Sequence, residues 1–202
     1  MIAPLTCVPP IALLKAACQE GSLLIELHEN YQKQTIRNRY HILAPNGVQT
    51  LSIAVMGQKG EKIPSPEIRI DHDKPWLREQ IRSIKTAYGS APFYDFYMDS
   101  IEELLSYPAD DLGSFCKYSL EVWFDLLDIK IPVNFTEDFH EEPVSIDFRQ
   151  RIKFPTQTLD ITLPKYIQVF DDRFDFVPNL SVIDLLFNLG PEASSYLNGA
   201  YD

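Results

Sequence analysis

Long apolar runs, cysteine clusters and a signal-like start are absent from this chain of 202 residues. No stretch approaches the roughly 18 consecutive apolar residues that mark a membrane-spanning helix, so we expect no membrane insertion. The first residues have neither the basic start nor the continuous apolar core of a secretory signal peptide. The three cysteines, Cys7, Cys18 and Cys116, are odd in number and widely spaced, which favours free thiols over a disulfide framework. Both observations predict a cytoplasmic protein.

Glycine and basic residues are also few. With 8 Gly and 45% hydrophobic residues, the composition excludes a fibrous or mainly disordered chain and supplies enough apolar residues for a sizeable core. The 18 Lys and Arg are outnumbered by 29 Asp and Glu, so the net charge of −11 argues against nucleic acid as a partner. The 15 prolines favour many short elements over a few long helices.

The periodicity of apolar residues predicts a mixed α/β (α+β) fold, and the length predicts a single compact domain over residues 1–202. We expect a mixed or antiparallel sheet that contains a hairpin and packs against several helices. Asn46-Gly47 between two β-like stretches indicates the hairpin, because both residues accept a positive φ at little cost. Helices are predicted over 11–19, 73–88, from Ser100 onward, 111–128 and 182–189, and strands over 23–27, 35–43, 49–55 and 67–71 and near 133–135 and 145–148.

Two of these helices have capping signals at their predicted starts. Ser100 with Glu103, and Ser181 with Asp184, have the spacing of a capping box, in which the two side chains satisfy backbone N–H groups of the first turn. Gly190 followed by proline predicts the end of the last helix.

Basic residues gather in the segment 31–60, which contains no acidic residue. Lys33, Arg37, Arg39 and Lys59 give this segment a charge of +4, whereas the remainder of the chain, with 14 basic and 29 acidic residues, carries −15. Such a contrast could hold an anionic ligand.

Strand geometry sharpens this prediction. Side chains alternate along a strand, so a strand over 35–43 would place Arg37, Arg39 and His41 on one face, with Lys33 in line if the strand extends back. Two arginines on one face could bracket a diphosphate, since each guanidinium offers a planar fork of donors. The alternative is a solvated strand face whose arginines pair with acidic residues elsewhere, and the sequence leaves both interpretations open.

Two single residues are candidates for catalysis. His28 lies beside Glu29 where a predicted buried strand leaves the core, so it could act as a general base, and a structural histidine is the alternative. Cys116 lies on an apolar helix stripe, which is typical of an inert core thiol rather than a nucleophile.

Motifs for several other kinds of chemistry are missing. The runs 71–73 and 140–142 contain metal-ligand residue types, but adjacent residues do not converge on one ion, so we expect no metal. The sequence has no G-x-G-x-x-G, no Walker loop and no G-x-S-x-G, which argues against the ordinary nucleotide-binding folds and serine hydrolases, and no cofactor is expected.

Three blocks of residues resemble the WbqC-like proteins. The blocks are collinear and span nearly the whole chain. The first is 29–34 followed by Arg37-Asn38-Arg39, the second is Trp76 ahead of 87–88 and 91–93, and the third comprises 166–170 and 176–190, in which Pro178-Asn179-Leu180-Ser181 begins a helix.

The resemblance implies a cytoplasmic step on a nucleotide-linked sugar. WbqC-like proteins occur in bacterial O-antigen and other surface-polysaccharide gene clusters, and one proposal makes them transferases that attach glycine or another acyl group to a sugar. We therefore predict an enzyme that moves an acyl or aminoacyl group onto an amino or hydroxyl group of a nucleotide-activated sugar. The alternatives are a noncatalytic binding or scaffold protein of the same pathway and a domain whose basic face binds an acidic partner. Assembly into a homo-oligomer also stays open.

The resemblance and the basic face together suggest roles for four residues. Lys33, Arg37 and Arg39 would hold the diphosphate of the ligand, which could also be another phosphorylated small molecule. His28 would deprotonate the sugar nucleophile. Replacing Arg37 by alanine should then weaken ligand binding without unfolding the chain.

Four further residues complete the expected substrate-binding site. Asn38 and Asn179 would hydrogen-bond the sugar or the oxyanion that develops during transfer, and His41 and Gln168 would contact the substrate. Many relatives have a histidine at the position of Gln80, so a mechanism that used that histidine could not operate here.

Overall fold

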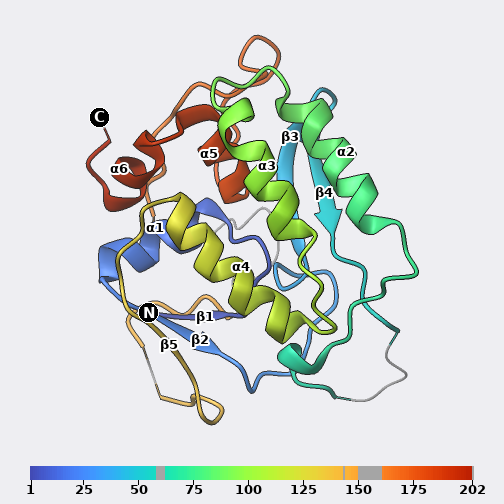
Figure 1. Cartoon of the computed structure of the whole chain (residues 1–202). Helices are drawn as coiled ribbons and strands as arrows, with labels where there is room; N and C mark the ends of the chain where they lie inside the picture. The colour runs from blue at the N-terminus through green and yellow to red at the C-terminus, as the bar shows by residue number, and fades with distance from the viewer. Residues whose placement is uncertain (58–61, 143, 150–160, 202) are drawn as a thin grey trace.

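Three short parallel strands form one sheet of the computed structural model, which describes residues 1–57, 62–142, 144–149 and 161–201 (Figure 1). Strand β2 (Leu23–Glu26) lies between β1 (Ile2–Pro4) and β5 (Val133–Phe135). Residues 146–148 run along the other edge of β1, where the Ile2 N–H donates to the Ile146 carbonyl at 3.0 Å. Apolar β2 is almost fully buried, as its sequence predicts.

Helix α1 (Ile11–Glu20) connects the parallel strands β1 and β2, and so forms a βαβ unit. The helix begins directly after Pro10 and ends at Gly21, whose φ of 70° is in the left-handed region that favours glycine. Its first seven residues are all buried, so α1 is a core helix rather than a surface helix.

The predicted hairpin is present as β3 (Arg39–Ala44) paired with β4 (Gly47–Ser52). Pro45 and Asn46 form its two-residue turn, and only Gly47, with φ of 105°, adopts the positive φ that we expected of both Asn46 and Gly47. The hairpin and the parallel strands form two separate sheets.

Helices cover both sheets and make most of the core. Figure 1 shows α2 (Trp76–Tyr88) and α3 (Tyr94–Leu105) side by side, with α2 packed on the hairpin, while α4 (Leu112–Leu126) packs against the 3₁₀ turn η1 (Ser65–Glu67). The C-terminal helices are α5 (Val182–Leu189), which contacts α3 and β3, and α6 (Glu192–Asn198), which contacts α1. The prediction of a mixed α/β fold with a hairpin packed against helices in one compact domain is confirmed.

Several predicted element boundaries are wrong. Helix α3 starts at Tyr94, so Ser100 lies inside it, because the buried stripe of Met98, Ile101 and Leu104 continues the helix on both sides of the capping motif. Residues 67–71 form no strand, and only isolated bridges join Arg69 and Ile70 to other segments. Residues 145–148 form one bridge to β1 instead of a strand.

Strand β3 is shorter than predicted, and this difference matters for the site. The predicted strand over 35–43 begins only at Arg39, because the Arg39 N–H donates to the Thr35 carbonyl at 3.2 Å and closes a turn over the residues between them. Lys59, which contributed to the basic segment, lies outside the described residues.

Candidate functional site

A pocket lies between β3 and the starts of helices α1 and α5, and we call it the Arg39 pocket. Arg39, His41 and Asn179, three of the residues predicted to bind substrate, line it together with Pro10 and Ser181. The space inside has a volume of about 10 Å³, which is room for about one water molecule. The fold therefore brings the segments around Arg39 and Asn179 together, and the surface that they present to the pocket is almost entirely apolar.

Alternation along β3 places Arg39 and His41 on one face, opposite Ser52 and Thr50 of β4. Both side chains are half-buried, and the His41 Nδ1 atom lies 3.1 Å from the Thr50 hydroxyl. Burial and the positive charge of Arg39 lower the pKa of His41 to about 4. The imidazole is therefore neutral at pH 7, and its low pKa makes it a weaker base than an ordinary histidine.

Asn179 is fixed at the start of α1. Its side-chain oxygen accepts a hydrogen bond from the Ala12 N–H at 2.9 Å, so it caps the helix from a distant part of the chain. The backbone of Asn179 has a φ of 57°, a left-handed conformation that asparagine tolerates better than most residues. The neighbouring Leu180 carbonyl accepts from the Ile11 N–H at 3.0 Å.

Ser181 also lines the pocket, and sequence analysis missed it as a site residue. It precedes α5 as predicted, but its side chain makes no capping hydrogen bond, and its buried hydroxyl has no hydrogen-bond partner among the described residues. Leaving a buried hydroxyl unsatisfied costs about 1–3 kcal/mol. The capping-box pattern predicts that this hydroxyl caps the first turn of α5, and that hydrogen bond does not form. The sequence therefore did not mark Ser181 as a site residue.

Asp184, the other half of that pattern, is instead the centre of a buried network. Its carboxylate accepts hydrogen bonds from Tyr88 at 2.8 Å, Tyr166 at 2.5 Å and Gln168 at 2.9 Å. Burial raises the pKa of Asp184, although the three hydrogen-bond donors act to lower it. The Gln168 amide also exchanges two hydrogen bonds with the backbone of Val177, so its predicted substrate-binding groups are engaged within the fold.

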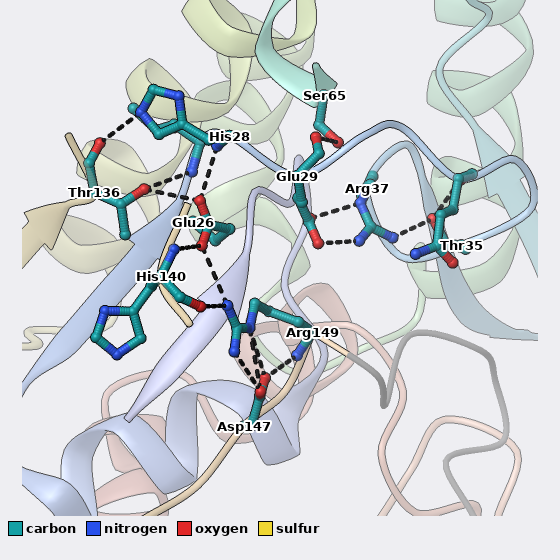
Figure 2. Close-up of polar contacts among 12 residues, drawn as sticks. Glu26, His28, Glu29, Thr35, Arg37, Ser65, Thr136, His140, Asp147 and Arg149 are labelled. Atoms are coloured by element: carbon teal, nitrogen blue, oxygen red, sulfur yellow. Dashed lines mark hydrogen bonds and ion pairs between the residues drawn. The ribbon is translucent and has the colours of Figure 1, made fainter. Parts of the chain in front are cut away.

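Arg37 does not share the face of Arg39 and His41, because it lies in the turn before β3. Its side chain is 1% exposed and forms a two-armed ion pair with Glu29, at 2.8 Å from Nε and 2.5 Å from the second terminal nitrogen (Figure 2). Its remaining terminal nitrogen donates to Thr35 at 3.1 Å. The prediction that Arg37 shares one face with Lys33 and Arg39 is therefore wrong, because Arg37 is buried against Glu29.

A second buried carboxylate lies close to this pair, at the carboxyl end of β2. Glu26 accepts hydrogen bonds from the backbone N–H groups of His28 and His140, from the Thr136 hydroxyl and from Arg149, as Figure 2 shows. Burial opposes ionisation of Glu26, but the four donors together hold its pKa below the usual value. Glu26 therefore joins β2 to the segment after β5.

The remaining predicted residues lie outside the Arg39 pocket. The ring of His28 is exposed, and its Nε2 lies 3.2 Å from the Thr136 carbonyl. Lys33 is exposed in the loop before β3. Asn38 is buried, where it donates to the Ile53 carbonyl at 2.8 Å and accepts from the Tyr31 hydroxyl at 2.9 Å.

A wider groove lies along α2 and is also new relative to the sequence analysis. It has a volume of about 770 Å³ and is lined by Lys74, Arg78, Arg82 and Lys85, the last of which pairs with Glu102 at 2.8 Å. All four basic side chains are exposed, so water screens their charges and weakens their interactions with other charged groups. Arg78, Arg82 and Lys85 recur at helical spacing in the sequence, but they do not form a contiguous basic segment, so the sequence analysis did not identify this groove.

Neither a membrane-spanning helix nor a cluster of metal-ligand residues occurs among the described residues. No helix in the described ranges is long and apolar enough to cross a membrane. Nowhere in that part of the chain do three or more His, Cys, Asp or Glu residues gather as metal ligands. The three cysteines are free thiols, and those of Cys7 and Cys116 are buried with their sulfurs 3.1 Å apart.

Comparison with known proteins gives one match. The model of the WbqC-like protein family matches residues 7–162 and 147–196, which include every residue of the Arg39 pocket discussed above. No curated protein and no solved structure matches the chain.

Proposed function

Because the chain belongs to the WbqC-like protein family, we propose that it is a transferase of bacterial surface-polysaccharide biosynthesis. It would move an acyl or aminoacyl group onto an amino or hydroxyl group of a nucleotide-activated sugar. The observation that carries this proposal is the Arg39 pocket, where a guanidinium and a neutral imidazole lie on one strand face beside Asn179.

Arg39 supplies the anion-binding part of the site. Its guanidinium is half-buried and offers the planar fork of donors that suits phosphate oxygens. The pocket volume of about 10 Å³ is too small for a sugar or a nucleotide, so in this proposal the ligand lies outside it, along the half-buried strand face of Arg39 and His41.

His41 is the base in this proposal, in place of the predicted His28. Its neutral imidazole would take the proton of the sugar nucleophile as the new bond to the acyl carbon forms, although its low pKa makes it a weaker base than an ordinary histidine. The carbonyl electron pair then returns and expels the carrier of an activated donor such as a thioester, and His41 passes its proton to that leaving group. The ring of His28, in contrast, lies at Thr136 outside the pocket.

Ligand binding provides the first test. At a hundredfold excess over its dissociation constant, a nucleoside diphosphate sugar should stabilise the protein by ~2.7 kcal/mol, a thermal shift of roughly 5–10 °C. Arg39→Ala should lose this shift, whereas Arg82→Ala, which removes the same side chain from the exposed groove on α2, should keep it. Equal shifts in both variants would contradict the assignment of the pocket.

Turnover provides the second test. With the bound sugar nucleotide and acyl-coenzyme A or other activated acyl donors, His41→Gln should keep binding and lose transfer. A sugar nucleotide whose binding depends on Arg39 and that is never converted would contradict the transferase and favour a noncatalytic binding protein.

A further inference from the structure

A separate pocket lies beside the segment that precedes α5, and we call it the Ile167 pocket. Its volume of about 380 Å³ is near the lower end of the ~300–1,000 Å³ typical of small-molecule sites. It shares no lining residue with the Arg39 pocket. Its lining includes three exposed charged residues and three apolar ones: Lys165, Asp171 and Asp175, and Ile167, Phe174 and Phe176.

The loop that contributes most of these residues is closed at its base by Gln168. The Gln168 side chain donates to the Val177 carbonyl at 3.1 Å and accepts from the Val177 N–H at 2.9 Å, so the two ends of the loop are held together. Inside the loop, the Phe170 carbonyl accepts from the N–H groups of Arg173 and Phe174, at 3.0 and 2.9 Å. Compact surface loops whose ends lie close together are frequently functional. Gln168 therefore positions the loop and does not itself contact a ligand.

Ile167 presents an apolar side chain to this pocket, and it is 76% exposed. Its two neighbours, Tyr166 and Gln168, are 6% and 3% exposed, and both donate to the Asp184 carboxylate, at 2.5 and 2.9 Å. Because both neighbours are anchored in the core, a ligand can cover Ile167 with little loss of conformational freedom in the chain.

The charged side chains of the pocket have no partners within the part of the chain that the structure describes. Neither an ion pair nor a side-chain hydrogen bond joins Lys165, Asp171 or Asp175 to a described residue. Two carboxylates against one ammonium group repel a phosphate, so the pocket does not suit a nucleotide. The three groups supply acceptors and a donor, which match hydroxyl groups, since each hydroxyl both donates and accepts hydrogen bonds.

We propose that the Ile167 pocket binds an unphosphorylated pyranose unit of a saccharide. The face of the sugar ring, with its carbon-bound hydrogens, packs on the apolar side chains, and its hydroxyl groups bond to the two carboxylates and the ammonium group. A volume of about 380 Å³ suits about one or two such rings. The inference goes beyond the proposed function, because saccharide binding in this pocket requires neither a nucleotide nor transfer.

Titration of the full-length protein with simple sugars, followed by NMR, tests the inference. The probes are the methyl glycosides of glucose, galactose and mannose, and N-acetylglucosamine. At least one should bind with a dissociation constant on the order of 1 mM, as expected for about 13–15 non-hydrogen atoms. Binding should shift the backbone signals of residues 165–168 and 171–176.

Substitutions in the loop locate the binding. Asp171→Asn and Asp175→Asn should each weaken binding of that sugar about fivefold, because hydrogen bonds to charged groups are the stronger ones. Asp172→Asn removes the same charge from an exposed residue of the same loop that does not line the pocket, and should leave the affinity unchanged. Ile167→Ala should also weaken binding. All four variants alter exposed side chains and should keep the wild-type melting temperature, so a loss of binding is not a loss of folding.

Two results would overturn the inference. One is the absence of any signal change with all four sugars at about 100 mM, a hundredfold excess over the expected constant, or equal sugar affinity in Asp171→Asn, Asp172→Asn and Asp175→Asn. The other is binding of choline without binding of any sugar, since the aromatic and acidic side chains would then hold an organic cation.

Discussion

The ion pair between Glu29 and Arg37 makes a quantitative prediction about stability. Arg37→Ala removes both arms of the pair and the bond to Thr35, and it leaves the Glu29 carboxylate, whose side chain is 8% exposed, without its cation. Breaking a buried pair on one side costs about 3–5 kcal/mol. This loss is a large fraction of the ~5–15 kcal/mol that stabilises a typical domain. The sequence analysis predicted that Arg37→Ala would weaken ligand binding without unfolding the chain. The structure instead leads us to expect that this variant markedly destabilises the folded protein.

Urea unfolding followed by tryptophan fluorescence measures the loss, since Trp76 and Trp123 are 6% and 0% exposed and both should respond to unfolding. Arg82→Ala on the exposed face of α2 is the matched control and should change the free energy of unfolding by less than about 0.5 kcal/mol. The double variant Glu29→Leu with Arg37→Met should be more stable than Arg37→Ala, because it buries no unpaired charge.

The loss should also depend on pH. Burial, the largest influence, already raises the pKa of Glu29 although Arg37 lowers it, so removing Arg37 raises this pKa further. A carboxyl group whose pKa is higher in the folded state than in the unfolded state destabilises the fold as pH rises through the folded pKa. The deficit of Arg37→Ala should therefore be greatest at neutral pH and shrink under mild acid. A loss below about 1 kcal/mol at pH 7 would refute the reasoning.

Two further predictions concern the core. Gly190→Ala should destabilise the protein more than Gly21→Ala in urea unfolding. Both glycines have a positive φ, at 54° and 70°, but only at Gly190 would a Cβ meet the Phe93 ring, at 2.5 Å. Equal losses of stability would show that the ring moves aside. Diamide treatment in mild urea should join Cys7 to Cys116, whose sulfurs are 3.1 Å apart, with a mass loss of two hydrogens that Cys116→Ala abolishes; any other pairing would contradict the observed contact.

Local signals predicted the elements that depend on them. The apolar stripe of α4 and the cap at Asp111, whose carboxylate accepts from the Ser114 N–H at 2.7 Å, place that helix within two residues of its observed bounds. The pair Arg39 and His41 on one face follows from strand alternation alone. The joining of Asn179 to that face does not, because it depends on how α5 packs against β3.

The errors arise where a turn or a distant partner outweighs the local pattern. The strand predicted over 35–43 begins only at Arg39, because the hydrogen bond from the Arg39 N–H to the Thr35 carbonyl closes a turn that places Arg37 against Glu29. Glu29 and Arg37 have opposite charges and are only eight residues apart in the sequence, and this proximity could have predicted their ion pair. For Ser181 no signal was available, because an unused cap and a used cap have the same sequence.

The way helices α1 and α5 complete each other's first turns sets an order on synthesis. Pro9 supplies the acceptor for the start of α5, and Asn179 and Leu180 supply acceptors for the start of α1. A ribosome therefore releases the N-terminal helix long before its cap exists, and at about 5–20 residues per second this interval lasts roughly 10–30 s. During that time the apolar surface of α1 is available to chaperones, and a chain cut short before Asn179 should be a substrate for proteolysis rather than a partly active protein.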